Sequence, residues 1–470
     1  MVRATCGRRA GRRAFRNARR RTLSPDVMPA TGTPPALDSS TTIPSRDAAQ
    51  LRAVMRPPPD DPEARSRALH ERLAAFPAAV FQFDARMREG WYTDRYFLRT
   101  TETLKHAGRS PRVRMQLFAK KDGVLAGVYE ALRMLETQLA PLPGGSARPG
   151  LSDLTIDTLL EGDIIRPWES VMHIEGPYLA FAHLETTLLG VLARRTLVAT
   201  NVRRVMEAAN GKQVIFMAAR HDDWRVQTPD GYAAMVGGAG SVSSAAGGAW
   251  WGLAGVGTMP HAVIAAFDGD VVAATLAFAA YVRDCEPEVQ VVSLVDYRND
   301  VVADSLAVAR AMRERFGPGS LAAVRIDTSE MLEDVSLASV PNSAFLPDEP
   351  RNGVSSALVR RLRGALDAAG FPEVGIFVSG GFVPTKMRRF EESGVPVAGY
   401  GVGSSTLGHN RGDVDGLVTG FDFTADVVRV DGRAESKVGR SEHANPRFVR
   451  LDASRVPAPG ARDATSASAV

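Results

Sequence analysis

Two glycine-rich segments, about twenty residues apart, contain groups that could bind a phosphate. Each follows the apolar residues of a predicted strand. Glycine lets backbone N–H groups approach an anion closely, and serine hydroxyls add hydrogen-bond donors. Either segment alone is typical of a turn, but the two together favour one shared phosphate site. The residues are Ser379, Gly380 and Gly381 in the first segment and Gly401, Gly403, Ser404 and Ser405 in the second.

Charged residues end the other predicted strands of the same region. Arg325 and Asp327 stand two apart in "VRIDTS", so their side chains share one face of a strand. Asp296 ends "VVSLVD", and Arg220 with His221 follows "VIFMAA". Charges at the end of an apolar strand are costly unless paired or functional, and a structural ion pair is the alternative for Arg325 and Asp327. With the glycine segments, these residues predict a site for a sugar phosphate that carries a second charged group.

Metal binding by histidine is not indicated. The eight histidines form no HxxxH motif and no cluster with cysteine. A Mg²⁺ ion held mostly by substrate phosphates and by one or two carboxylates is compatible with the charged strand ends. A P-loop, a GxSxG motif and a GxGxxG motif in a fitting context are all missing from the sequence.

Alternating strands and helices must position these groups. A long helix is predicted over 184–211, and apolar strands over 212–220, 289–296, 321–327, 373–381 and 395–405, with a glycine-rich connection after the first strand. Helices are predicted over 303–317, 355–370 and 384–394. Repeated strand–helix units with continuously apolar strands predict a parallel sheet, here an irregular α/β barrel. In such barrels the active site lies at the C-terminal ends of the strands.

The flanking segments have different patterns. Residues 61–178 predict an α+β domain with helices over 61–76 and 91–108 and an antiparallel sheet. The barrel is predicted over 179–408, and residues 409–455 predict polar, alternating strands that return to the first domain and complete it. The predicted disordered tails are residues 1–60, rich in Arg and Pro, and 456–470.

The composition is ordinary for a globular protein, with 44% hydrophobic and 23% charged residues in a chain of 470. The longest apolar stretch, 262–282, is interrupted by Asp268 and Asp270, so no membrane span is expected. No signal-peptide core is evident, and the two cysteines, Cys6 and Cys285, leave the body without an internal disulfide. A cytoplasmic protein is expected.

The net charge of +4 is concentrated at the N-terminus. The first 21 residues carry nine arginines and no acid, so the remainder is mildly acidic and nucleic-acid binding is not expected. Three interpretations of residues 1–27 compete. They are a solvated extension or a translation-start artefact with Met28 as the true start, a nucleic-acid arm, and a targeting peptide. We favour the first.

Several motifs, in their order along the chain, resemble those of the nicotinate phosphoribosyltransferases. They are "WYTDRYFLRTTETL", "DGVLAGVYEALRML", "ETTLLGVLARRTLVAT", "GVGTMPH", "VRIDTSE", "VSGGF" and "GYGVGSS". These enzymes are type II phosphoribosyltransferases, with the quinolinate and nicotinamide enzymes. The resemblance covers roughly residues 92–450. It implies an N-terminal α/β domain, completed by the C-terminal segment, beside an irregular α/β barrel. The implied reaction joins nicotinate to 5-phosphoribosyl 1-pyrophosphate with Mg²⁺, usually coupled to ATP hydrolysis, in NAD biosynthesis.

The resemblance also implies roles for single residues. His261 in "GTMPH" would accept a phosphate, Thr258 would lie in the substrate site, and Arg220 would bind pyrophosphate or the pyridine carboxylate, with His221 a weaker candidate. Tyr92 would stack on the pyridine ring of a neighbouring subunit, which implies a homodimer with shared active sites.

The remaining implied roles concern the phosphoribosyl group. Arg325 would bind phosphate, and Asp327 would bind the ribose hydroxyls or, with Asp296, Mg²⁺. The two glycine segments would hold the 5′-phosphate. The pyridine nitrogen already carries a lone pair, so the reaction needs positioning and charge stabilisation rather than a general base.

Three departures from the family pattern leave alternatives open. "VDYRND" lacks the usual threonine after Asp296, "RIDTSE" replaces a common Ser-Gly-Asp, and "RHDDW" replaces a double arginine and adds two acids. The alternatives are transfer to another pyridine, quinolinate or nicotinamide, and a homologue that binds a nucleotide without catalysis.

Overall fold

The computed structural model describes residues 47–143, 149–409 and 416–456. The predictions for residues 1–46 and for 457–470 therefore lie outside the described residues. None of the helices in these ranges has the length and apolar character needed to cross a membrane.

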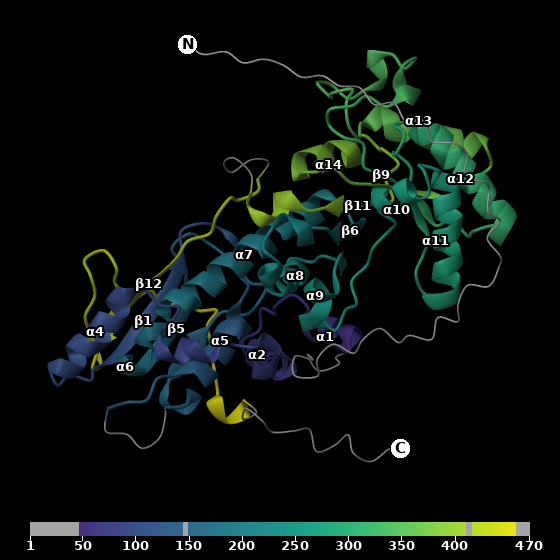
Figure 1. Ribbon diagram of the computed structural model, residues 1–470. Helices are drawn as coiled ribbons and strands as arrows, with labels where there is room; N and C mark the ends of the chain where they lie inside the picture. The colour runs from purple at the N-terminus through teal and green to yellow at the C-terminus, as the bar shows by residue number, and fades with distance from the viewer. Residues whose placement is uncertain (1–46, 144–148, 410–415, 457–470) are drawn as a thin grey trace, which may run out of the picture. The chain divides into compact units, whose positions relative to one another are not determined.

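The first of two large sheets is antiparallel and has six strands (Figure 1). Its order is β13 (Arg433–Ala434), β12 (Phe423–Val430), β1 (Arg112–Ala119), β5 (Ser170–Pro177), β3 (Thr155–Thr158) and β14 (Val449–Arg450). The C-terminal strands thus lie at both edges of a sheet whose centre comes from the first half of the chain. A short pair, β2 (Gly123–Val124) with β4 (Ile164–Ile165), stands beside it.

Helices from the first part of the chain accompany this sheet, and α2 begins as the sequence predicts. Asp61 accepts a hydrogen bond from Ala64 N (2.7 Å), and Pro62 follows at the first helical position. The buried Leu69, Leu73 and Phe76 form the predicted apolar face. The helices are α1 (Ala48–Val54), α2 (Pro62–Ala75), α3 (Ala78–Phe81), α4 (Arg95–His106), α5 (Val128–Gln138) and α6 (Tyr178–Phe181).

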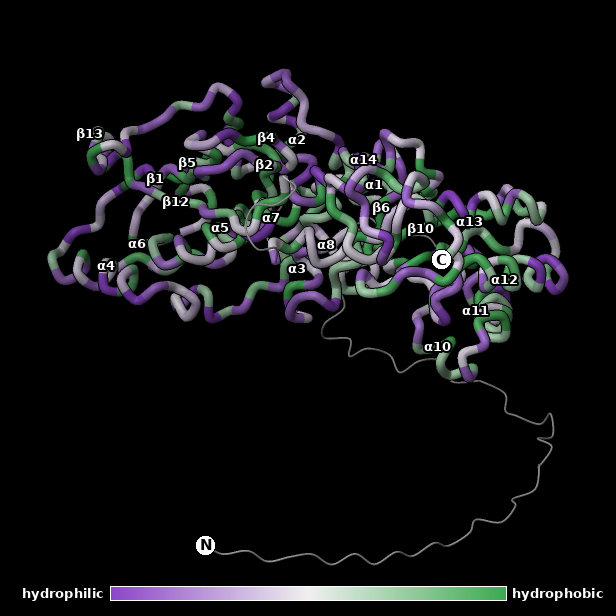
Figure 2. Tube along the Cα trace, turned by 90° about the horizontal axis from the view of Figure 1, so that it is seen from above, coloured by the Kyte–Doolittle hydropathy of each residue, from purple (hydrophilic) through white to green (hydrophobic). Residues whose placement is uncertain are grey.

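Helix α4 starts later than its pattern predicts. The sequence predicts a helix from residue 91, but Gly90 has a φ of +72° and Asp94 is still extended, so the helix begins at Arg95. Both hydrophilic and hydrophobic residues occur along α4 (Figure 2), and only Phe97 and Thr101 of this helix are buried. Trp91 and Tyr92, which precede the helix, and Tyr96 in its first turn remain exposed.

Helix α7 (Glu185–Ala208) contacts β12 of the antiparallel sheet, strand β2, and the helices α8 (Gln227–Val236) and α14 (Pro384–Glu392). Its fully buried Asn201 donates to Val418 O (2.9 Å) and accepts from Val418 N (2.8 Å). This side chain supplies both hydrogen bonds of a backbone residue that enters the C-terminal segment, so α7 fixes where that segment leaves the parallel sheet.

The second large sheet is parallel and has six strands. Its order is β7 (Ser241–Val242), β6 (Gln213–Phe216), β11 (Gly399–Val402), β10 (Gly375–Val378), β9 (Ala323–Ile326) and β8 (Val292–Leu294). All its pairs are parallel. In the described residues β7 and β8 form the two edges of the sheet and do not pair with each other, so it is an open half-barrel. The α/β fold with a separate antiparallel sheet is confirmed, while the domain boundaries at 61, 179 and 409 stay predictions.

The helices of the half-barrel follow the predicted spans where the strands alternate with them. They are α8 (Gln227–Val236), α9 (Ala245–Gly248), α10 (His261–Ala266), α11 (Val271–Cys285), α12 (Val301–Phe316), α13 (Ser356–Ala368) and α14 (Pro384–Glu392).

The glycine-rich connection expected after the first barrel strand is instead structured. It contains β7 and the helices α8 to α11. Glycine serves close packing here: a Cβ at Gly231 would lie 2.0 Å from Gly247 O, and one at Gly248 would lie 2.2 Å from Leu253 O. Glycine content was therefore a poor guide to a loop, because these glycines let backbones touch.

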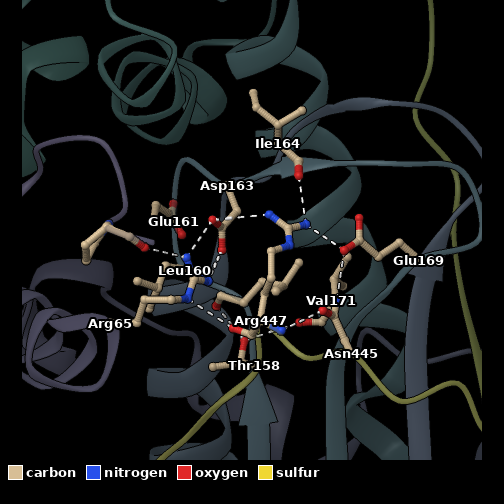
Figure 3. A network of polar contacts seen from close by, with 12 residues as sticks. Arg65, Thr158, Leu160, Glu161, Asp163, Ile164, Glu169, Val171, Asn445 and Arg447 are labelled. Atoms are coloured by element: carbon tan, nitrogen blue, oxygen red, sulfur yellow. Dashed lines mark hydrogen bonds and ion pairs between the residues drawn. The ribbon is translucent and has the colours of Figure 1, made fainter. Parts of the chain in front are cut away.

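A buried ionic network joins the start of the described chain to its end (Figure 3). Arg65 of α2 grips Asp163 with two nitrogens, at 2.6 and 3.1 Å, and donates to Arg447 O. Arg447 itself lies 3.5 Å from Asp163 and donates to Glu169 (2.6 Å). The side chains of Arg65 and Asp163 are each 5% exposed, so each charge depends on the other.

We expect Arg65→Ala to lower the free energy of unfolding by roughly 3 kcal/mol or more, because it leaves the buried Asp163 without its main partner. Arg67→Ala is the matched control, since Arg67 lies on the same helix in an exposed pair with Glu63. Denaturant unfolding of both variants measures the difference. Equal effects from the two would contradict a structural role for this network.

Candidate active site

A cleft of about 530 Å³ lies at the C-terminal ends of the parallel strands. It is built from the segments that follow β6, β9, β10 and β11, together with the start of α10. Most of the residues singled out from sequence meet here. The lining residues are Met217, Arg220, His221, Pro260, His261, Arg325, Asp327, Ser379, Gly380, Gly381, Phe382, Val383, Gly401, Val402, Gly403, Ser404 and Ser405.

The two glycine segments adopt backbone conformations or contacts that require glycine. Gly380 and Gly381 have φ of +82° and +67°, just before α14 begins at Pro384. A Cβ at Gly403 would lie 2.7 Å from both Met217 O and the His221 ring. Both segments therefore bring bare backbone to one side of the cleft, which suits an anion.

Arg325 is the hub of the polar contacts in the cleft. Its Nε donates to Thr258 Oγ1 (3.1 Å), and its Nη1 donates to Ser379 Oγ (3.0 Å) and lies 3.6 Å from Asp327. Ser379 in turn donates to Asp327 Oδ1 (2.8 Å). One guanidinium group thus holds together the segment before α10, the end of β9 and the residue after β10. The carboxylate of Asp327 is oriented by the Ser379 hydroxyl and by its ion pair with Arg325.

His261 and Asp296 face each other at the edge of the cleft. His261 Nε2 lies 3.2 Å from both carboxylate oxygens of Asp296. The His261 side chain is 46% exposed, whereas that of Asp296 is 5% exposed. Burial raises the pKa of Asp296, and the nearby His261 opposes this shift. The carboxylate fixes the imidazole through Nε2, and the contacts of the described residues leave Nδ1 free.

Arg220 and His221 stand on a turn after β6 (Ala219–His221). Arg220 is exposed and lines the cleft. His221 is half-buried, and its buried Nδ1 has no hydrogen-bond partner among the described residues. Burial and the positive charge of Arg220 lower the pKa of His221. The cleft therefore offers one permanent cation and one neutral imidazole at this end.

The two acids that follow His221 do not line this cleft. Asp222 accepts from Arg194 (2.7 Å) and lies 3.5 Å from His409, while Asp223 pairs with Arg225 (2.8 Å). A backbone hydrogen bond from Asp223 and the Arg194 guanidinium lower the pKa of Asp222. Both carboxylates are thus ionised and paired with arginines outside the cleft, although Arg194 is shared with the buried Asp230 (2.6 Å).

Tyr92 is not brought into the cleft of its own chain. It lies between the short 3-10 helix Ala85–Glu89 and α4, where its hydroxyl donates to Asp84 (2.5 Å) and accepts from Arg86 (2.8 Å). Asp296 and Thr258 do not line the cleft either, but they contact it through His261 and Arg325.

Sequence reasoning missed Met217, Pro260, Phe382, Val383 and Val402 as lining residues, and Arg194 as the partner of Asp222. Met217 is held by a hydrogen bond from its N to Val402 O (2.7 Å), and a Cβ at Gly401 would lie 2.6 Å from its sulfur. No sequence signal distinguishes these apolar residues from core, although glycine at 401 and 403 indicated close approach.

The described residues contain no group of three or more histidine, cysteine, aspartate or glutamate side chains placed to hold a metal. Asp327 and Asp296 are the carboxylates near the cleft, and both already accept from protein donors. These residues fit a Mg²⁺ ion that takes most of its ligands from bound phosphates, and they do not fit an all-protein metal cage.

Comparison with known proteins finds similarity to phosphoribosyltransferases. Residues 94–196 match the model of the quinolinate phosphoribosyl transferase N-terminal domain. A nicotinate phosphoribosyltransferase of Mycobacterium tuberculosis is 25% identical over 278 residues, 59% of this chain and 52% of the relative. The human nicotinate phosphoribosyltransferase is 32% identical over 127 residues, 26% of this chain and 23% of the relative. The match thus spans about half the length of the mycobacterial relative.

Solved structures share the fold. The crystal structure of nicotinate-nucleotide pyrophosphorylase from Pyrococcus furiosus aligns with a TM-score of 0.61 and 28% identity, covering 79% of this chain and 85% of that one. Human nicotinic acid phosphoribosyltransferase aligns with a TM-score of 0.54 and 18% identity over 75% and 77% of the two chains.

We expect Gly403→Ala to weaken binding of inorganic phosphate by about tenfold or more, ~1.4 kcal/mol, because the new Cβ displaces Met217 and His221. Gly364→Ala is the control, since Gly364 lies in α13 with open space around it. Isothermal titration of both variants gives the result. Unchanged binding in Gly403→Ala would show that the segment around Gly403 does not bind the anion.

Proposed function

Because the chain belongs to the type II phosphoribosyltransferases, the family of the nicotinate and quinolinate enzymes, we propose that it transfers a phosphoribosyl group to nicotinate in NAD biosynthesis. The substrates are nicotinate and 5-phosphoribosyl 1-pyrophosphate, and the products are nicotinate mononucleotide and pyrophosphate. ATP hydrolysis assists the reaction. The observation that carries the proposal is the meeting of the glycine segments, Arg325, Asp327 and His261 in one cleft.

The cleft contains groups suited to each part of the phosphoribosyl donor. The glycine segments and the first turn of α14 would hold the 5′-phosphate. Asp327, oriented by Ser379, would accept from the ribose hydroxyls, and Arg325 and Arg220 would face the pyrophosphate. Bound Mg²⁺, held by the phosphates with Asp327 or Asp296, would neutralise pyrophosphate charge as it leaves.

The transfer itself needs no general base from the protein. The pyridine nitrogen forms a bond to the anomeric carbon with its own lone pair, and the bond from that carbon to pyrophosphate breaks with its electrons on oxygen. Positioning and stabilisation of the positive ribosyl centre are what the cleft would supply, through Asp327 and through the cations that receive the leaving group.

ATP assistance would act through His261. Asp296 holds Nε2, which leaves Nδ1 to form a phosphorus–nitrogen bond while the bond from the phosphoryl group to ADP breaks. The buried carboxylate of Asp296 would stabilise the positive charge that the imidazole acquires. Water would later cleave the phosphohistidine to phosphate, and the released energy would favour nucleotide formation.

A homodimer with shared sites is part of the proposal. Trp91, Tyr92 and Tyr96 are 67%, 42% and 59% exposed, an unusual density of exposed aromatic side chains within one short segment. A second copy that covers them would bury their rings and bring Tyr92 to the pyridine of the other active site. The cytoplasm is the proposed compartment.

Nicotinate is favoured over the alternatives by the pairing of the acids after His221. Since Asp222 and Asp223 pair with Arg194 and Arg225 rather than with Arg220, Arg220 remains available for one carboxylate. Quinolinate has two carboxylates, and the neutral His221 beside Arg220 is less suited to a second one. A homologue without catalysis would not need the His261–Asp296 pair.

The decisive experiment measures pyrophosphate release by the purified protein with 5-phosphoribosyl 1-pyrophosphate and Mg²⁺. Nicotinate, nicotinamide and quinolinate are compared, each with and without ATP. We expect release with nicotinate and faster release with ATP. Release with only nicotinamide or only quinolinate would show that the substrate is that pyridine and not nicotinate. Nucleotide binding without turnover of any base would support a homologue that binds without catalysis.

We expect His261→Ala to abolish the stimulation by ATP while some ATP-independent transfer remains, because the variant lacks the phosphate acceptor but keeps the cleft. Asp296→Asn should reduce the stimulation, since the amide cannot balance the imidazolium charge. His106→Ala, at the exposed end of α4, is the control. If ATP stimulates His261→Ala as strongly as the unmodified protein, the phosphohistidine is ruled out.

A further inference from the structure

A second cavity, of about 210 Å³, lies beside the cleft and shares Val383 with it. It opens between the segment before α13 and the first two turns of α14. Its walls are largely apolar, and two cations stand in it, Lys386 and Arg389. The lining residues are Leu346, Glu349, Pro350, Asn352, Val354, Val383, Thr385, Lys386, Arg389 and Phe390.

The ammonium group of Lys386 rests on aromatic rings rather than on a carboxylate. Its Nζ lies 4.4 Å from the ring centroid of Phe382 and 5.8 Å from that of Phe390. In the described part of the chain, no hydrogen bond or ion pair holds it. The nearby Glu349 is occupied, because it accepts from Leu346 N (3.0 Å), Ser356 N (2.7 Å) and Ser356 Oγ (2.5 Å).

This environment favours the neutral amine. Burial lowers the pKa of Lys386 to about 8, and the negative charges of Glu349 and Glu330 only partly oppose the shift. Arg389, in the same cavity, adds positive charge. An ordinary lysine has a pKa of ~10.4, so at pH 8 Lys386 has roughly a hundredfold larger neutral fraction than an exposed lysine.

Lysine is also rare in this chain. Six of its 57 basic residues are lysine, and the others are arginine. Arginine gives the same charge and a stronger hold on an aromatic ring, but it never loses its proton in a protein. Of the two basic side chains in the cavity, Lys386 is therefore the one of a type that can act as a nucleophile.

We propose that Lys386 is a modification site that forms a reversible imine with small aldehydes that carry an anionic group. The neutral Nζ attacks the aldehyde carbon and forms a carbon–nitrogen bond. The carbonyl oxygen takes up the two amine protons and leaves as water, so no oxidant or reductant is needed. Arg389 receives the anionic group, and the apolar walls exclude the water that would reverse the reaction.

The site lies next to the phosphate-binding loop, which gives the modification a route to the cleft. Phe382 both lines the cleft and carries the ammonium of Lys386. Formation of the imine would remove the cation–π contact between Lys386 and Phe382 and place a bulkier group against the Phe382 ring, next to Gly381. The chemistry of Lys386 is independent of which pyridine the cleft accepts.

Pyridoxal 5′-phosphate, an aldehyde with a phosphate group, is the probe for the test. The full chain is treated with a limiting amount at pH 8, reduced with borohydride to fix any imine, digested and mapped by mass spectrometry. We expect Lys386 to be labelled about tenfold or more above each other lysine, since its neutral fraction is far larger. Lys386→Arg should remove this label and keep the charge and the fold.

Lys212→Arg is the matched control. Lys212 pairs with Glu391 (2.8 Å) of α14, the helix that contains Lys386. This variant should leave the label on Lys386 unchanged. The labelling rate of Lys386 should reach half of its maximum near pH 8. Even labelling of Lys105, Lys120, Lys437 and Lys386, a rate that rises only towards pH 10, or bound probe without a borohydride-stable adduct would each overturn the proposal.

Discussion

The candidate site depends on one requirement, that the charge of Arg325 be balanced at the end of an otherwise apolar strand. The side chain is 13% exposed, and its nitrogens reach Thr258, Ser379 and Asp327. The contacts that balance this charge hold three side chains at fixed positions. They are Thr258 before α10, Ser379 after β10 and Asp327 after β9. The same contacts that stabilise the guanidinium thus arrange the polar wall of the cleft.

The sequence predicted the parts of this site better than their contacts. Period-two spacing placed Arg325 and Asp327 on one face, and apolar runs that end in glycine placed Gly380 and Gly403 at strand ends. Contacts between distant elements leave no local signal, so the pairing of His261 with Asp296 and of Asp222 with Arg194 could not be predicted. Tyr92 lies in one of the family motifs, but it does not line the cleft of its own chain.

The fold was predictable where strands and helices alternate and failed where small residues pack closely. Leu358, Leu362 and Leu366 repeat at helical spacing and are all buried in α13. Between residues 221 and 288 the sequence is rich in glycine and alanine, which is also typical of loops, and the helices α8, α10 and α11 were missed. In this segment the short side chains allow backbones to pack closely, and they do not mark a flexible loop.

The antiparallel sheet constrains the order in which the molecule can form. Strand β1 pairs with β12, whose residues are synthesised more than 300 positions later, and β3 pairs with β14 at a similar separation. Neither edge of this sheet can close on a ribosome until nearly all of the chain has emerged. Contacts of such high sequence separation predict slow folding and a long-lived intermediate with open strand edges, so this protein should depend on chaperones more than a fold of local contacts would.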